Sequence, residues 1–115
     1  MAVVLLVEDH AGVRELLRRL LVPFHTVIEA QNEVDACGLL ARYPVDVVVL
    51  DLQLAGDRRL VLCQQIRAHQ RLRRIGVILL TGAVTEQVLT DPSFDMVLEK
   101  PSGVLLLRLA VNLLA

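Results

Sequence analysis

The sequence is poor in cysteine, in aromatic residues and in long apolar runs, and these shortages exclude several classes of protein. Its two cysteines, Cys37 and Cys63, lie in apolar helical patterns without metal-ligand spacing, so we expect buried, reduced thiols. Although 55% of the 115 residues are hydrophobic, no apolar run approaches the roughly 18 residues that a membrane-spanning helix needs. The apolar residues at the start have no basic leader before them, which predicts a cytoplasmic protein.

Charge of one sign is lacking as well, because the formal net charge is only −1. Basic residues do gather between Arg58 and Arg74, yet this stretch contains no aromatic residue on which a base could stack. A solvated helix face followed by a loop is therefore favoured over a phosphate-binding surface. We expect the chain to bind no membrane, and to meet nucleic acid only through a domain outside this chain.

What the sequence does contain is a regular alternation of two patterns. Short runs dense in Val, Ile and Leu are typical of strands that are covered on both faces, and they lie at 2–7, 25–30, 45–51, 76–81 and, more weakly, 95–99. Amphipathic or apolar helical patterns follow them, within 10–23 and at 33–42, 60–69, 85–89 and 103–114. This alternation predicts an α/β fold with a parallel sheet between two layers of helices, as one domain over residues 1–115.

Polar side chains stand where the predicted strands end. Glu8 and Asp9 follow the first predicted strand, Asp51 ends the third, Thr81 ends the fourth, and Lys100 follows the fifth. Open parallel α/β sheets bind ligands at the carboxyl ends of their strands, so we expect these five side chains to share one site. Singly, each could merely cap a helix or a turn, but that reading does not explain why they all fall at the same end of the strands.

Carboxylates gathered in this way need a cation. Repulsion between two neighbouring carboxylates costs about 4 kcal/mol at an effective dielectric of about 20. Lys100 offsets one charge, and Mg²⁺ or Mn²⁺, which prefer oxygen ligands and also bind phosphoryl oxygens, would offset the rest. The pattern predicts that Asp51 attacks a phosphoryl group, while Lys100 neutralises its oxygens and Thr81 donates a hydrogen bond to one of them.

Two residues near this predicted site, Lys100 and His10, have more than one explanation. Lys100 is the only lysine in a chain whose other cationic side chains, histidine aside, are arginines. This choice indicates a need for a compact point charge, although a composition that favours arginine explains it equally well. His10 follows the acidic pair, and we interpret it as a surface histidine at a helix start, because carboxylate-rich sites select ions that prefer oxygen ligands.

Four segments of the chain, LLVEDH, VVVLDLQLAG, VILLTGA and LEKP, resemble the signature segments of response regulator receiver domains of bacterial two-component systems. The resemblance covers the whole chain, which looks like a receiver domain of the chemotaxis-regulator type. It implies a flavodoxin-like three-layer α/β/α sandwich, with a five-stranded parallel sheet in the order 2-1-3-4-5 and five helices.

By this resemblance Asp51 is the phosphoacceptor. Asp9 and Asp51 would bind Mg²⁺ (or Mn²⁺) directly together with the backbone carbonyl of Gln53, and Glu8 would help through water.

The resemblance assigns Thr81 as the switch hydroxyl and Lys100 as the phosphate-binding lysine. The phosphoryl donor would be a phosphohistidine on a sensor histidine kinase or on a histidine phosphotransfer domain. Such a domain is a signalling switch and not an enzyme, since it promotes only its own phosphorylation and dephosphorylation.

The sequence also departs from the family pattern. Ala55 stands where the family usually has a proline, Arg59 where it has a glycine, and Val97 where it has the aromatic residue that switches. The segment between Thr81 and Lys100 is short, which predicts a clipped helix there. We therefore predict that phosphorylation is retained while the structural response to it differs from the usual one.

The last predicted helix carries more apolar surface than one buried stripe needs. From 104 to 115, only Arg108 and Asn112 are not Val, Leu or Ala. We expect this surface to be covered, either in a homodimer formed through this helix or by a further domain of a longer protein.

Other functions remain to be weighed. A pseudo-receiver, which binds partners without being phosphorylated, is the main alternative. A flavin-binding flavodoxin would need a Ser, Thr or Gly-rich phosphate loop where Glu8 and Asp9 stand. A haloacid-type phosphatase would need an acid where Gln53 stands, so the sequence disfavours both enzymes.

Overall fold

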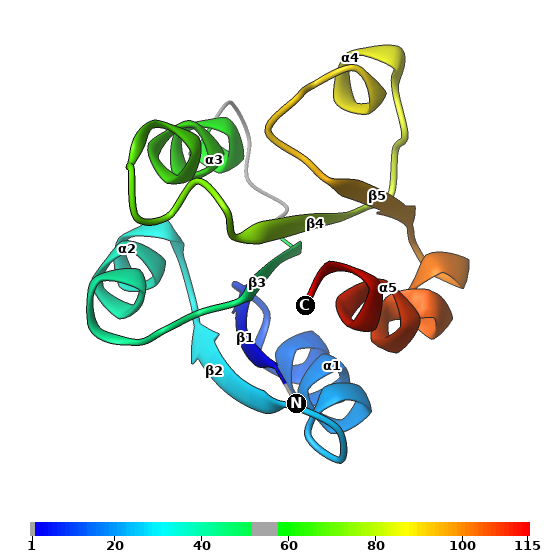
Figure 1. Ribbon diagram of the computed structural model, residues 1–115. Coiled ribbons are helices and arrows are strands. Elements are labelled where there is room, and N and C mark those ends of the chain that lie inside the picture. The colour runs from blue at the N-terminus through cyan, green and yellow to red at the C-terminus, as the bar shows by residue number, and fades with distance from the viewer. Residues whose placement is uncertain (1, 52–57) are drawn as a thin grey trace.

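One parallel sheet forms the centre of the protein in the computed structural model, which describes residues 2–51 and 58–115 (Figure 1). Its strands are β1 (Val3–Glu8), β2 (Thr26–Ala30), β3 (Val47–Asp51), β4 (Gly76–Thr81) and β5 (Met96–Glu99). They lie in the order β2-β1-β3-β4-β5, and every neighbouring pair is parallel. The predicted fold class and strand order are therefore confirmed.

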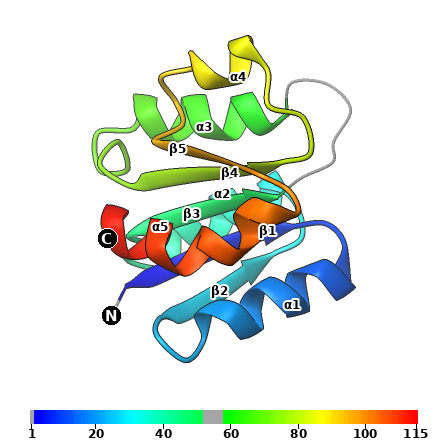
Figure 2. The same cartoon turned by 90° about the vertical axis from the view of Figure 1, so that its right-hand side faces the viewer.

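Helices cover both faces of the sheet (Figures 1 and 2). The α-helices are α1 (Ala11–Leu21), α2 (Glu33–Arg42), α3 (Arg58–Ala68), α4 (Glu86–Leu89) and α5 (Leu107–Leu114), and a 3₁₀ helix, η1 (Ser102–Leu106), precedes α5. α2 and α3 lie on one face, and α1 and α5 lie on the other. The predicted clipping of the helix between β4 and β5 is confirmed, because α4 has only four residues.

Side-chain caps explain where several helices begin. The Asn32 side chain accepts the Asp35 N–H at 2.9 Å and starts α2, as the sequence predicts. The Thr85 side chain accepts the Val88 N–H at 3.2 Å and starts α4. At α1 the capping residue is His10 and not its acidic neighbour.

The strands are apolar on both sides because two cores sandwich them. Along β3, for example, Val48 and Leu50 pack in the core under α2 and α3, whereas Val49 packs in the core under α1 and α5. All five residues of β3 are buried. A strand covered on both faces has no solvent-facing row, which is why the apolar runs in the sequence do not alternate.

Two expectations need correction. The helical pattern at 103–114 is split into η1 and α5, with Gly103 packed so closely on β5 that a Cβ there would lie 2.9 Å from the Cβ of Leu98. Cys63 is buried as expected and neither cysteine forms a disulfide, but Cys37 is only half-buried. Its thiol faces a groove between α2 and α3, which the local sequence pattern does not reveal.

The structure also bears on the membrane question. Within residues 2–51 and 58–115, no helix has both the length and the apolar content needed to cross a bilayer.

Candidate functional site

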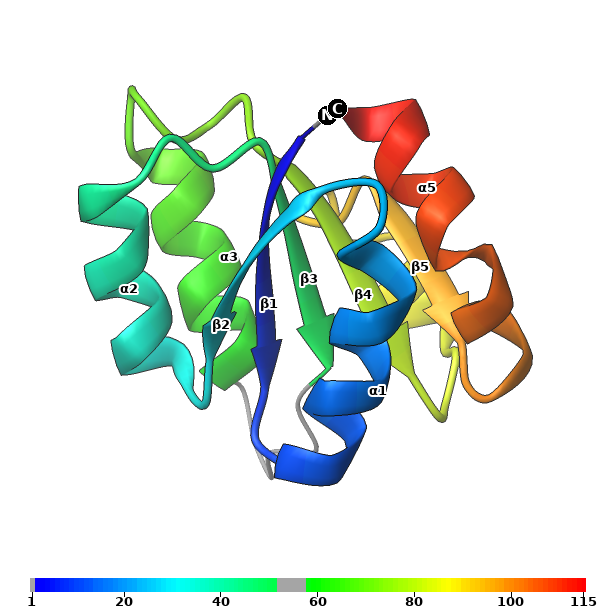
Figure 3. The same cartoon turned by 90° about the horizontal axis from the view of Figure 1, so that it is seen from below.

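The carboxyl ends of the strands meet at one edge of the sheet, where Figure 3 shows the arrowheads together. Glu8 and Asp51 are direct partners in the register of β1 with β3. Thr81 ends β4 opposite Glu99 of β5, and the N–H of the following Lys100 donates to the Thr81 carbonyl at 2.8 Å. Adjacent strands therefore deliver these side chains to one place.

Asp51 is the most deeply buried acid of the site, with 1% of its surface exposed. Its Oδ1 forms an ion pair with Nζ of Lys100, whose side chain is 22% exposed. Neither carboxylate oxygen accepts a hydrogen bond from any described residue. Because a buried carboxylate is costly without hydrogen bonds, Oδ2 has an unmet capacity to bind a cation or an electrophile.

Glu8 adjoins Asp51 and is 2% exposed. Its Oε1 accepts the His10 N–H at 2.9 Å, whereas Oε2 has no partner among the described residues. Burial, reinforced by the neighbouring Asp51 carboxylate, raises the pKa of Glu8 from its ordinary 4.5 to about 9. Lys100 forms its ion pair with Asp51, so a proton or a further cation is needed to balance the charge of the second buried acid, Glu8.

Thr81 is buried, and its hydroxyl is occupied locally. Its Oγ1 lies 3.2 Å from both the N and the O of Ala83, accepting from the first and donating to the second. The hydroxyl is therefore satisfied by the β4–α4 loop. A stronger acceptor at the Asp51 carboxylate would compete with the Ala83 carbonyl for its proton.

A cavity of about 240 Å³ opens beside these groups, and we call it the acid cavity. It is lined by Glu8, Asp9, His10, Val13 and Lys100. Asp9 is exposed at its rim, while His10 uses Nδ1 to accept the Val13 N–H at 3.2 Å. The expectation that His10 marks a helix start is thus confirmed.

The residues present fit a hard cation in their chemistry. Glu8 Oε2 and Asp51 Oδ2 are buried carboxylate oxygens without partners, and Asp9 adds a third carboxylate at the rim. The described residues do not place three His, Cys, Asp or Glu side chains close enough to hold a metal by themselves. The remaining predicted ligand, the Gln53 carbonyl, lies outside the described residues, as does Ala55.

Arg14 is a positioning residue that the sequence analysis missed. Its Nη1 donates to the Glu8 carbonyl at 3.0 Å, and its Nε lies 3.4 Å from Oε1 of Glu29 at the end of β2. Arg14 thereby links α1 to the ends of β1 and β2. The sequence pattern predicts an amphipathic helix here, but only the tertiary fold brings Glu29 of β2 within reach of Arg14.

Residues 4–112 match the family model described as response regulator receiver domain. The response regulator MprA of Mycobacterium sp. (strain KMS) is 36% identical over 100 residues, which make up 85% of this chain and 44% of MprA. The chain thus spans less than half the length of that relative.

Two solved structures extend the comparison. The chemotaxis protein CheY4 of Vibrio cholerae superposes with a TM-score of 0.88 at 18% identity, over 100% of this chain and 99% of that one, which bears on the fold alone. The response regulator TrrA of Thermotoga maritima, solved in complex with Mg²⁺ and BeF, has a TM-score of 0.81 at 26% identity and full coverage of both chains.

Proposed function

The chain belongs to the response regulator receiver domain family, and from this premise we propose that Asp51 accepts a phosphoryl group in a Mg²⁺-dependent reaction. The observation that carries the proposal is the state of Asp51. Its carboxylate is 1% exposed, is paired with Lys100 and has an oxygen without any partner among the described residues. We further propose that residues 1–115 act as one receiver unit in the cytoplasm.

The reaction is the transfer of a phosphoryl group from a donor to the Asp51 carboxylate. An Asp51 carboxylate oxygen forms a bond to phosphorus as the bond from phosphorus to the donor breaks, and the donor leaves with the bonding electron pair. The donor is a phosphohistidine on a sensor histidine kinase or a histidine phosphotransfer domain, or a small acyl phosphate. Lys100 offers a positive charge to the oxygens of the phosphoryl group.

Asp9 and Asp51, with the Gln53 carbonyl, are the residues that would hold Mg²⁺ directly, and Glu8 would help to hold it through water. When bound, the ion supplies the positive charge that two buried acids and a phosphoryl group require beyond one lysine. Mn²⁺ prefers the same oxygen ligands and would substitute for it.

The switch acts through Thr81. A phosphoryl group adds about two negative charges at Asp51, which gives the Thr81 hydroxyl a stronger acceptor than the Ala83 carbonyl. Rotation of that hydroxyl away from Ala83 would move the loop that leads into α4. In the family, the response usually continues through rotation of an aromatic ring at the position that Val97 takes here. Valine has no ring, so the response would not continue by that route.

We expect purified protein to gain one phosphoryl group when it is incubated with acetyl phosphate and Mg²⁺, as measured by intact mass. Removal of the metal with EDTA should reduce incorporation to the background level, because the acidic pair then repels the incoming phosphate. Adding excess Mg²⁺ back to the EDTA-treated sample should restore incorporation, which shows that the loss is reversible. A pseudo-receiver would acquire no phosphoryl group under either condition.

We also propose that the chain forms a homodimer through a row of leucines on η1 and α5. Leu105, Leu109 and Leu113 recur every fourth residue and are 82%, 58% and 69% exposed. Burying one leucine contributes about 1.5–3 kcal/mol, so such a row favours association.

Light scattering over a concentration series tests this association, and a mass that rises towards that of a dimer is expected. Leu109→Ser should weaken dimerisation by at least about tenfold. Leu89→Ser on α4 is the matched control, because Leu89 is 62% exposed and lies outside the row. A monomer at every concentration would refute the proposal.

A further inference from the structure

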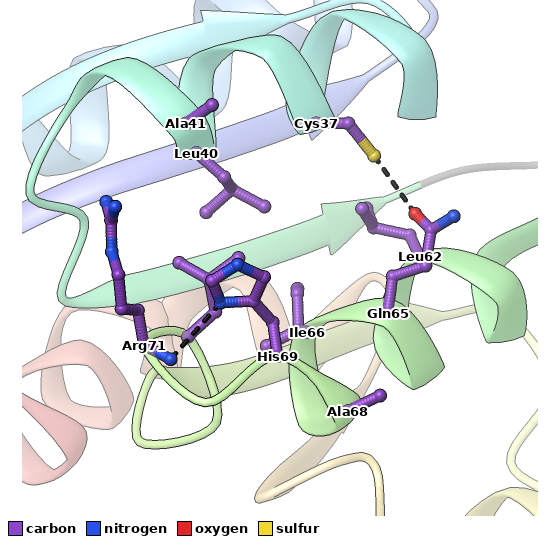
Figure 4. A pocket seen from close by; sticks show the side chains of 10 residues that line it. Cys37, Leu40, Ala41, Leu62, Gln65, Ile66, Ala68, His69 and Arg71 are labelled. Atoms are coloured by element: carbon purple, nitrogen blue, oxygen red, sulfur yellow. Dashed lines mark hydrogen bonds between the residues drawn. The ribbon is translucent and has the colours of Figure 1, made fainter.

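A second cavity lies between α2 and α3 (Figure 4). It measures about 510 Å³ and shares no lining residue with the acid cavity. We call it the α2/α3 groove. Its volume falls within the roughly 300–1,000 Å³ that is usual for small-molecule sites.

The floor of the α2/α3 groove is apolar. Leu40 of α2 and Leu62 and Ile66 of α3 are buried core side chains that meet beneath it. Leu72, from the segment after α3, is half-buried and adds to the wall. Such a floor suits the apolar body of a ligand and offers nothing to a small inorganic ion.

Polar groups stand at the two ends of the groove. Figure 4 shows Cys37 and Gln65 at one end, where the Cys37 thiol donates to Oε1 of Gln65 at 3.1 Å. Arg71 stands at the other end, with the His69 ring beside it. The Arg71 backbone N–H donates to Nδ1 of His69 at 3.1 Å, which fixes this corner of the groove.

The Arg71 guanidinium has no ion-pair or hydrogen-bond partner among residues 2–51 and 58–115. The contrast with Arg67 is informative, since the Arg67 guanidinium bonds Asp95 and three backbone carbonyls and holds the loops together. Arg73 and Arg74 are exposed beside Arg71, and the segment 69–75 contains no acidic residue. The polar end of the groove is therefore complementary to an anion.

We propose that the α2/α3 groove binds a small amphipathic carboxylate, namely a medium-chain fatty acid. The apolar body lies over Leu40 and Ile66, and the carboxylate pairs with the Arg71 guanidinium. A planar guanidinium can donate two parallel hydrogen bonds to one carboxylate, which favours this headgroup over a neutral one. The proposal is independent of phosphorylation at Asp51.

Decanoate is the probe, titrated into the full chain and followed by isothermal calorimetry and by amide chemical shifts. We expect saturable binding with shifts confined to α2, to the end of α3 and to the segment 69–75. Decyltrimethylammonium, which has the same chain and the opposite charge, should bind at least about fivefold more weakly. Equal binding of the two, or shifts centred on α5, would overturn the proposal.

Three variants test the contacts. Arg71→Gln should weaken decanoate binding about fivefold, the upper range for one partly solvated ion pair, while Arg74→Gln should change it less than twofold. Ala41→Phe, at an exposed position of α2 that lines the groove, should block binding by filling it. Unchanged thermal unfolding of each variant shows that the fold is kept, and equal loss in both arginine variants would contradict the assignment.

Discussion

Replacing Asp51 by asparagine should abolish phosphoryl incorporation from acetyl phosphate. The amide has nearly the shape of the carboxylate, so it fits the same buried position, but its oxygen is a far weaker nucleophile and its nitrogen a donor. Lys100 loses its ion-pair partner, yet it is 22% exposed and water can solvate its charge. We therefore expect a folded protein without acceptor activity.

The measurement is intact mass after incubation with acetyl phosphate and excess Mg²⁺. Asp35→Asn is the matched control, because Asp35 is an exposed aspartate on α2 away from the acid cavity, and this variant should incorporate as much phosphate as the wild type. An adduct that persists in Asp51→Asn would place the acceptor elsewhere. An adduct absent from the wild type as well would favour the pseudo-receiver.

The sequence was sufficient to predict the fold and the grouping at the sheet edge. Parallel strands buried on both faces leave dense Val, Leu and Ile runs, and the polar residue that ends each run marks the carboxyl end. Glu8 and Asp51 could be assigned to one site on this ground, and their pairing in the register of β1 with β3 agrees. The short α4 followed from comparison with the family pattern, since fewer residues than usual separate Thr81 from Lys100.

Side-chain contacts between distant elements could not be predicted in this way. The link from Arg14 to the Glu8 carbonyl and to Glu29 depends on how α1 crosses the ends of β1 and β2. The half-buried state of Cys37 depends on the spacing between α2 and α3, and that spacing also creates the α2/α3 groove. Periodicity reports which face of a helix is apolar, but not how closely its neighbour packs.

The Thr81 hydroxyl is occupied by a local contact, with the backbone two residues further along the chain. A threonine at the end of β4 suggests a hydrogen bond to phosphate, yet its hydroxyl bonds the backbone of Ala83. A phosphoryl group on Asp51, as proposed, would therefore compete with an existing contact for the Thr81 hydroxyl. This competition makes the proposed switch a shift between two hydrogen-bonded states, with the loop before α4 as the part that moves.

Lys100→Met should slow phosphoryl incorporation by about 100-fold, the usual loss when one charged group that stabilises a transition state is removed. Methionine has a similar length and no charge, so the cavity stays filled while the buried Asp51 carboxylate loses its ion-pair partner. Loss of one member of a buried ion pair costs up to about 3–5 kcal/mol, and less here because Lys100 is partly solvated. Urea unfolding measures this loss separately from the rate.

Lys100→Arg is the decisive comparison, because it separates the two explanations for a single lysine in a chain rich in arginine. If the overall composition alone favours arginine, the variant should react at the wild-type rate. If the site requires a compact point charge, the longer planar guanidinium cannot lie between Asp51 and the phosphoryl oxygens without displacing one of them. We expect a rate between those of the wild type and Lys100→Met, with stability close to the wild type because the charge is retained. A wild-type rate would mean that Lys100 supplies only its charge.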